Sequence, residues 1–392
     1  MSARRPIPTD NGSNGTRPPG AKRRAFLVGI ALSGRPADEA EDHLNELAAL
    51  ADTAGAEIVG RAIQARKAPD PRLFVGPGKA AEIADEAKRL GTEVVVFDED
   101  LSGSQAKNLE EILKLPVVDR SGLILEIFER RARSREARTQ VELARLRYEL
   151  PRLARKWGHL SRQVGGIGVR GGEGETQLEA DRRVLRRRIE KLEEELVRID
   201  RMRRQQRRGR AELPVVALAG YTNAGKSTLF NRLTRDQTVA EDRLFATLDS
   251  RLRRGALDGD TWPVLFADTV GFIRKLPHHL VASFRSTLGE VVEADLVLHV
   301  VDRSHPGWEE QQSVAEEVLA ALDVDPERVL VAYNKADRLP PGEIVEPDAL
   351  AVSALTGEGL DELRSAIADR LTRLRALPRS AAGRLPTAPG IP

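Results

Sequence analysis

The feature that most constrains the fold of this chain is a glycine-rich motif past its middle. The motif follows the pattern GxxxxGK[ST] and consists of Gly220, Tyr221, Thr222, Asn223, Ala224, Gly225, Lys226 and Ser227. An apolar run at 214–219 precedes it and a helical pattern opening with Thr228 follows it, so the predicted order is strand, phosphate loop, helix. In such a loop, backbone N–H groups converge on phosphate oxygens and Lys226 adds a positive charge. Ser227 is then placed to ligate Mg²⁺.

A second motif, of the DxxG type, predicts the part of the site that detects the γ-phosphate. It follows the apolar run 264–266 and consists of Asp268, Thr269, Val270 and Gly271. Asp268 is expected to hold Mg²⁺ through its water shell, and the Gly271 N–H can sense the γ-phosphate. The order of the two motifs is the one found in nucleotide switches.

Two later motifs predict the base pocket. They follow two further predicted strands and consist of Asn334, Lys335 and Asp337 in an NKxD pattern, then Ser353, Ala354 and Leu355. The Asp337 carboxylate can accept from both N1–H and the exocyclic amine of guanine, and a site of this kind rejects the wrong base by on the order of 10⁴. Lys335 can lay its stem along the base. GTP and GDP are therefore the predicted ligands.

The region between the first two motifs, 236–249, is predicted to be a loop that responds to the nucleotide. Its candidate nucleotide contacts are Phe245, Ala246, Thr247, Leu248 and Asp249. Thr247 is expected to ligate Mg²⁺ only when the γ-phosphate is bound, so the loop orders with GTP and loosens after hydrolysis. Ser250 and Thr238 are weaker alternatives, because the first leads into a charged stretch and the second lies close to the helix after the phosphate loop.

The residue after the DxxG motif is Phe272, where many GTPases carry a glutamine that orients the attacking water. Phenylalanine cannot do this, so slow intrinsic hydrolysis is predicted. Water positioning is then expected from a partner, from rearranged switch loops or from a monovalent cation. The phosphate loop resembles that of potassium-dependent GTPases, which implies K⁺ bound by Asn223. The candidate catalytic residues are Lys226, Thr247, Gly271 and Asn223.

Composition indicates a globular protein of several domains. The chain has 392 residues, of which 41% are hydrophobic and 31% charged, and it has no cysteine. No apolar run approaches the roughly 20 residues of a membrane span, and residues 1–20 lack the apolar core of a signal peptide. Six histidines show no metal-ligand spacing. A cytoplasmic location and a monomer are expected, with disordered tails at 1–24 and 377–392.

The segment 25–120 alternates short apolar runs with helical patterns, which predicts a small α/β domain with a mostly parallel sheet. Within it, Gly76, Pro77, Gly78 and Lys79 precede a helix and suggest a second phosphate or RNA contact. The spacing is not that of a full phosphate loop, and a tight turn explains the same residues.

The segment 121–211 changes to a helical period and predicts an antiparallel hairpin. Apolar residues recur at spacings of three and four between 143 and 160 and again between 178 and 199. Pro151 should kink or divide the first helix, and the glycine-rich stretch 165–175 should form a mobile tip. Residues 182–210 contain thirteen basic and five acidic side chains. This density favours an RNA-phosphate partner over a solvated surface.

Taken together, these strings resemble the HflX family of bacterial ribosome-associated GTPases. The resemblance rests on residues 119–125, 165–178, 220–232, 244–249 and 267–277. It implies an N-terminal α/β domain with a helical hairpin, followed by a P-loop GTPase domain, at 212–376, with a doubly wound, mostly parallel sheet. It also implies binding to the large ribosomal subunit and its rRNA, and GTP-dependent dissociation of stalled or stress-damaged ribosomes.

Three alternatives stay open at this point. The first is a GTPase that assists ribosome assembly. The second is an RNA-binding or RNA-remodelling protein in which the nucleotide is only structural. The third is an additional ATP-dependent activity of the N-terminal domain through Lys79.

Overall fold

The computed structural model describes residues 22–33, 37–153, 173–208, 213–235, 244–245, 247–257, 262–275, 288–339 and 349–376. The tail predicted at 377–392 lies outside these ranges, as does 1–21 of the tail predicted at 1–24. The first strand begins at Arg23, two residues before the predicted boundary, because Arg23 and Arg24 already pair with the neighbouring strand.

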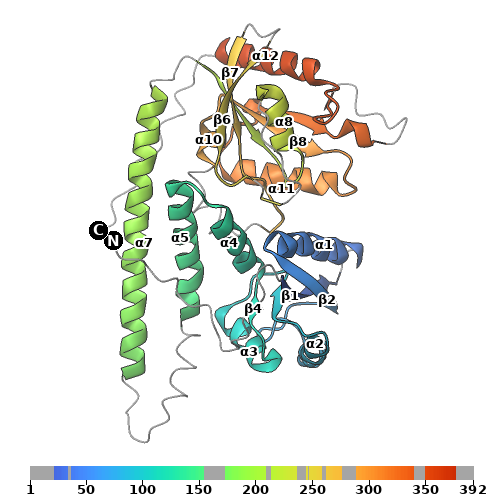
Figure 1. The fold of residues 1–392 in the computed structure, drawn as a ribbon, viewed down its shortest axis with the longest axis vertical. Coiled ribbons are helices and arrows are strands. Elements are labelled where there is room, and N and C mark those ends of the chain that lie inside the picture. Colours follow the sequence, from blue (N-terminus) through green and yellow to red (C-terminus); the bar gives the residue numbers. More distant parts are fainter. Residues whose placement is uncertain are drawn as a thin grey trace, which may run out of the picture.

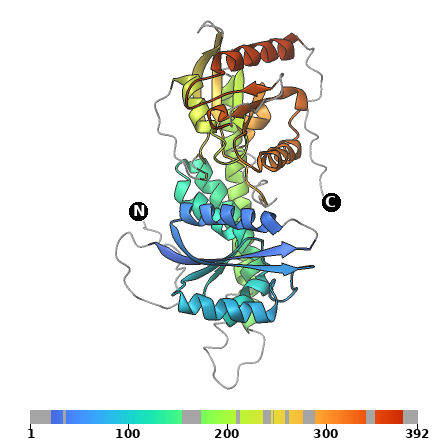
Figure 2. The same cartoon turned by 90° about the vertical axis from the view of Figure 1, so that its right-hand side faces the viewer.

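The N-terminal domain is a four-stranded sheet covered by helices on both faces (Figure 2). Its strand order is β2-β1-β3-β4 and every pair is parallel. Parallel strands need helical crossovers, which accounts for the alternating pattern in the sequence. The elements are β1 (Arg23–Leu32), α1 (Ala37–Thr53), β2 (Ala56–Arg66), α2 (Pro77–Arg89), β3 (Val94–Phe97), α3 (Gly103–Leu113) and β4 (Val117–Val118).

Helix α4 (Arg120–Arg131), which the predicted boundary at 121 placed in the hairpin, packs against α1 and β3 of the N-terminal domain as well as against α5. Its apolar residues, including Ile124 and Phe128, are buried in one core with α1. The prediction grouped 121–131 with the helices that follow it, because a helical pattern shows which residues are apolar but not which elements cover them.

The predicted antiparallel pair is formed by α5 (Arg135–Glu149) and the long helix α7 (Glu173–Arg208) (Figure 1). Ion pairs between the helices join Arg135 to Glu195 and Glu142 to Arg188, so the two helices run in opposite directions. Pro151 sits in a 3₁₀ turn, η1 (Leu150–Arg152), that follows the end of α5. Most of the predicted tip lies outside the described residues, but α7 already begins at Glu173, inside the stretch expected to be non-helical.

The GTPase domain is a six-stranded sheet of order β10-β9-β8-β5-β7-β6, parallel except for β6 against β7. The predicted α/β class with mostly parallel sheets is confirmed. Strand β6 was not predicted, because its charged sequence fits an edge strand rather than a buried one. The elements are β5 (Val215–Ala219), α8 (Lys226–Thr234), β6 (Arg251–Leu257), β7 (Trp262–Asp268), α10 (Gly289–Glu293), β8 (Leu296–Asp302), α11 (Trp308–Ala321), η2 (Pro326–Arg328), β9 (Val329–Asn334), η3 (Ala336–Arg338), β10 (Leu350–Ala351) and α12 (Leu360–Ala376).

The two α/β domains share a continuous hydrophobic core. It runs from α1 and α4 to the GTPase domain, where Phe245, Leu248 and Phe272 are buried. The rings of Phe128 and Phe245 meet edge to face with centroids 4.8 Å apart. The N-terminal domain is therefore packed directly against the two loops that were predicted to respond to the nucleotide.

Candidate active site

The phosphate loop connects β5 to α8 with the geometry that its glycines predict. Gly225 caps α8 with φ of +90°, and no side chain occupies the free N–H groups of that helix start. An added Cβ at Gly225 would lie 2.2 Å from Asn334 Nδ2. Lys226 is buried, and its ammonium donates to the Gly220 and Tyr221 carbonyls at 3.1 and 2.6 Å. The loop thus presents backbone donors and a fixed cation to an anion.

The three predicted Mg²⁺ ligands come together at the carboxyl end of β7. Ser227 Oγ lies 2.8 Å from Asp268 Oδ2 and 3.1 Å from Thr247 Oγ1, and Thr247 Oγ1 lies 3.0 Å from the same carboxylate oxygen. The other oxygen, Asp268 Oδ1, is buried without a hydrogen-bond partner among the described residues. Two hydroxyls and a carboxylate with an open lone pair fit a hard divalent cation.

Burial shifts both charged groups of this pocket toward their neutral forms. Desolvation lowers the pKa of the Lys226 ammonium from 10.5 to about 8, with Asp268 opposing the shift. Desolvation also raises the pKa of the Asp268 carboxyl, against hydrogen bonds from Ser227 and Thr247. A triphosphate beside Lys226 and a cation beside Asp268 would each supply the missing opposite charge.

The DxxG loop lies directly on the phosphate loop. The Phe272 N–H donates to the Gly220 carbonyl at 3.0 Å, and the Thr222 N–H donates to the Phe272 carbonyl at 2.7 Å. A Cβ added at Gly271 would lie 2.8 Å from Thr222 Cα and 2.9 Å from Lys226 Nζ. Only glycine permits this approach, which brings the Gly271 backbone beside Lys226.

The base-pocket motifs are tied to each other and to the phosphate loop. Asn334 is buried; its Nδ2 donates to the Ala224 carbonyl at 2.8 Å, and its Oδ1 accepts from the Ala354 N–H at 3.0 Å. The Asp337 carboxylate accepts from the Ser353 hydroxyl at 2.5 Å. These bonds hold the NKxD motif against the last predicted motif, residues 353–355.

Family models and similar proteins all point to one family of GTPases. Three family models match successive segments: a GTP-binding GTPase N-terminal model at 41–129, a GTP-binding GTPase middle-region model at 131–210 and a 50S ribosome-binding GTPase model at 215–335. The GTPase HflX of Magnetococcus marinus is 47% identical over 368 residues, which cover 91% of this chain and 85% of that protein. The GTPase HflX of Escherichia coli K12 is 46% identical over 361 residues, covering 90% and 84%.

The chain belongs to the HflX family of GTPases.

As a member of the HflX family, the protein binds guanine nucleotide and hydrolyses GTP. The predicted family resemblance and enzyme class are confirmed. A solved GTP-binding protein from Sulfolobus solfataricus in complex with GDP is 25% identical, with 90% of this chain and 99% of that chain covered and a TM-score of 0.46. No helix in the described part of the chain has the length and apolar character needed to cross a membrane.

In this HflX-family chain, the loop around Thr247 contacts the N-terminal and helical segments as well as the phosphate loop. Phe245 and Leu248 are buried in the shared core. The Asp249 carboxylate accepts from the backbone N–H groups of Arg133 and Ser134 at 3.0 and 3.2 Å, and from the Ser134 hydroxyl. Asp249 was predicted to contact nucleotide, but the structure places its carboxylate at the start of α5. Ala246 lies outside the described residues.

The remaining predicted residues lie in different surroundings. Thr228 lies in the first turn of α8, and the buried Thr269 hydroxyl donates to the Leu218 carbonyl at 2.6 Å. Asn223 is exposed with φ of +62°. Leu355 is exposed beside the base pocket.

Several residues that the sequence analysis did not single out support the HflX-family site. Asp302 accepts from Lys335 at 2.6 Å, and Arg232 donates to the Ala354 carbonyl at 3.0 Å. In the N-terminal domain, Glu46 accepts from the Tyr221 hydroxyl of the phosphate loop. Asp302 ends strand β8, and a carboxylate directly after an apolar run is a usable signal in the sequence. No local pattern marks Glu46, because its partner lies 175 positions away.

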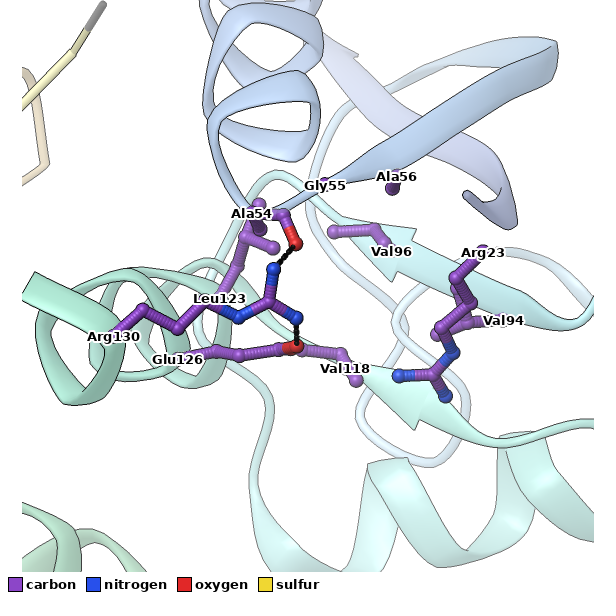
Figure 3. Close-up of a pocket in the computed structure, with 10 residues that line it drawn as sticks. All are labelled: Arg23, Ala54, Gly55, Ala56, Val94, Val96, Val118, Leu123, Glu126 and Arg130. Carbon is purple, nitrogen blue, oxygen red and sulfur yellow. Dashed lines mark hydrogen bonds and ion pairs between the residues drawn. The ribbon is translucent and has the colours of Figure 1, made fainter. Parts of the chain in front are cut away.

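The contacts given for Gly76 and Lys79 are internal to the N-terminal domain. Lys79 pairs with Glu82 of its own helix at 2.9 Å, and the Gly76 N–H donates to Gln64. A separate cavity of about 210 Å³ opens between the sheet and α4 (Figure 3). It lies at the amino ends of β1 and β3, near Arg23, whereas open α/β sheets bind ligands at the carboxyl ends. The turn interpretation of this motif fits these contacts.

Proposed function

We propose that this HflX-family GTPase binds the large ribosomal subunit through its rRNA and dissociates stalled or stress-damaged ribosomes in the GTP state. The observation that carries the proposal is helix α7, which spans 36 residues and is roughly 54 Å long. It runs beside α5 and extends past it (Figure 1). The family model that matches the GTPase domain is described as 50S ribosome-binding, which agrees with this partner.

The charge on α7 is arranged for contact with phosphate. Its glutamates at 193, 194 and 195 each pair with an arginine of α5 or α7. Exposed arginines stand elsewhere along the helix, at Arg183, Arg186, Arg187 and Arg201. Guanidinium groups presented along a long rod suit an RNA backbone recognised by shape.

A contact between the Thr247 loop and α5 supports coupling of nucleotide to the hairpin. Asp249 lies two residues after Thr247 in the sequence. Its carboxylate accepts hydrogen bonds from backbone N–H groups at the amino end of α5. We infer that GTP orders Thr247 and so fixes Asp249 on α5, which makes the ribosome-binding surface competent. Hydrolysis then releases Thr247 and loosens this connection.

The cofactors proposed for this reaction are Mg²⁺ and K⁺. Ser227, Thr247 and Asp268 would hold Mg²⁺, which supplies charge neutralisation of the β- and γ-phosphates. Asn223 is the proposed K⁺ ligand. The bound K⁺ would take over the role of the glutamine that Phe272 replaces. Comparing GTP turnover in KCl and NaCl tests this role, and equal rates would leave Asn223 as a loop residue only. The protein is proposed to act as a monomer in the cytoplasm.

The RNA-binding surface is tested with the double variant Arg186→Ala, Arg187→Ala. Cosedimentation with large subunits in the presence of a non-hydrolysable GTP analogue should weaken. The slope of log affinity against log salt concentration should become shallower by about 1.4–1.8, because two phosphate contacts are lost. The matched control is Arg370→Ala, Arg373→Ala on α12, which removes two arginines of the GTPase domain. If both pairs weaken binding equally, the effect is one of net charge and the α7 surface is excluded.

Ribosome dissociation itself is tested by incubating intact ribosomes with the protein and the GTP analogue, then resolving subunits by sedimentation. Free subunits that appear with the analogue and not with GDP support the proposal. Binding to large subunits without dissociation would instead favour a role in ribosome assembly. Affinity for RNA that does not depend on the nucleotide would favour an RNA-binding protein with a structural nucleotide.

A further inference from the structure

A closed set of polar contacts lies between the N-terminal and GTPase domains, outside the nucleotide pocket. Lys275 Nζ donates to one oxygen of Asp98 at 2.5 Å, and Arg120 donates to the other at 2.6 Å. Arg120 also donates to Glu46. Asp98 follows β3, Arg120 begins α4 and Glu46 lies on α1. The N-terminal domain therefore receives Lys275 on Asp98, which is held in turn by Arg120 and, through it, by Glu46.

The contacts return to the GTPase domain through the phosphate loop. The Tyr221 hydroxyl donates to the second oxygen of Glu46 and accepts from the Arg274 N–H at 2.8 Å. Arg274 precedes Lys275, so the path closes on itself. We call these residues the domain ring: Lys275, Asp98, Arg120, Glu46, Tyr221 and Arg274.

The domain ring is largely buried and its charged side chains are paired. Arg120, Asp98 and Tyr221 are 1%, 3% and 4% exposed. Asp98 and Glu46 pair with Lys275 and Arg120, while Arg274 joins the ring through its backbone N–H and its guanidinium pairs with Glu310 at 2.9 Å. Removing one partner from such a cluster leaves a buried charge uncompensated, so the cluster resists separation of its members.

The position of the domain ring relative to Gly271 suggests what it does. Residues 272–275 follow Gly271 directly. Tyr221 of the phosphate loop binds this segment at the Arg274 N–H, and the N-terminal domain binds it at Lys275 through Asp98. An added Cβ at Gly271 would lie 2.9 Å from Lys226 Nζ. A γ-phosphate held by both the Gly271 N–H and Lys226 needs room between them, whereas GDP makes no such demand.

We propose that the domain ring is a positioning device through which the N-terminal domain favours GDP over GTP. Glu46 and Asp98 hold the segment 272–275 against the phosphate loop, and a γ-phosphate must move Gly271 outward against that hold. Because coupling between two binding events is reciprocal, GTP weakens the Lys275–Asp98 contact of the ring and loosening that contact raises GTP affinity, whereas the separate contact of Asp249 at α5 is the one that GTP fixes. Glu46, Asp98 and Arg120 act through other residues and do not touch the nucleotide.

The test is Lys275→Met in the full chain, with affinities for GDP and a non-hydrolysable GTP analogue measured by calorimetry in Mg²⁺ buffer. The ratio of the two affinities should shift about tenfold toward the analogue, within the usual range of such coupling. Lys275→Arg retains the charge and should restore the original ratio. The matched control is Lys22→Met, which removes a 2.6 Å pair with Asp52 on the surface of the N-terminal domain.

A milder variant keeps the proposal testable if Lys275→Met does not fold. Glu99 is the second acceptor of Lys275, at 2.6 Å, and its side chain is 40% exposed. Glu99→Gln should therefore fold and shift the ratio in the same direction by about two- to threefold. An unchanged ratio in the folded variants, equal weakening of both nucleotides, or a shift toward GDP would overturn the proposal.

Discussion

Replacing Phe272 by glutamine introduces the residue that many GTPases use, directly after the DxxG motif, to orient the attacking water. We expect no acceleration of GTP hydrolysis. Phe272 is 1% exposed, and its side chain packs in the core shared by the two domains. Its backbone bonds the phosphate loop, at Gly220 and Thr222. A glutamine built on this backbone would point its amide into the core, away from the reacting phosphate.

The structural cost of Phe272→Gln follows from the same burial. Losing a fully buried phenylalanine costs about 3–5 kcal/mol. A buried amide without partners adds about 1–3 kcal/mol. This approaches the stability of a typical domain, about 5–15 kcal/mol, so the variant should be studied at low temperature with nucleotide bound. Phe272→Leu, which keeps an apolar side chain, should lose much less stability.

The assay is single-turnover phosphate release from preloaded GTP, with urea unfolding of each variant as the measure of stability. Phe272→Gln should release phosphate no faster than the wild-type chain and unfold at clearly lower urea. Phe272→Leu separates the effect of lost volume from the effect of the amide. A folded Phe272→Gln protein that hydrolyses GTP ten times faster would show that this side chain reaches the pocket, and the reasoning would fail.

Three further predictions concern the nucleotide pocket. Gly225→Ala, whose Cβ would lie 2.2 Å from Asn334 Nδ2, should reduce GDP affinity at least about tenfold in calorimetry, whereas Gly289→Ala, with no atom within 4 Å, should not. Asp268→Asn should raise the unfolding temperature of the nucleotide-free protein at neutral pH, because it removes a buried charge, and should reduce the stabilisation given by Mg²⁺ with GTP. Since burial lowers the pKa of Lys226 to about 8, stability of the nucleotide-free protein should rise between pH 8 and 10.5, where only the unfolded chain binds that proton, and GDP affinity should fall over the same interval. Proton uptake on GDP binding at pH 9 measures this linkage directly, and its absence would contradict a depressed pKa.

The local motifs were predictable because each encodes its own geometry. Gly225 provides the positive φ at the start of α8, and an apolar run before Asp268 places that carboxylate at the end of a parallel strand. Parallel strands bring their carboxyl ends to one edge of the sheet. Ser227 and Asp268 therefore meet although 41 positions separate them.

What the sequence could not determine is how the two domains pack. The destination of Asp249 at α5, the inclusion of α4 in the N-terminal core and the path from Lys275 to Tyr221 all depend on side chains distant in sequence. Periodicity records which face of an element is apolar, but not which element covers it. The residues of the nucleotide pocket could therefore be predicted from local motifs and their order. The connection of the pocket to the N-terminal domain was decided by tertiary packing, because each buried charge requires a specific partner.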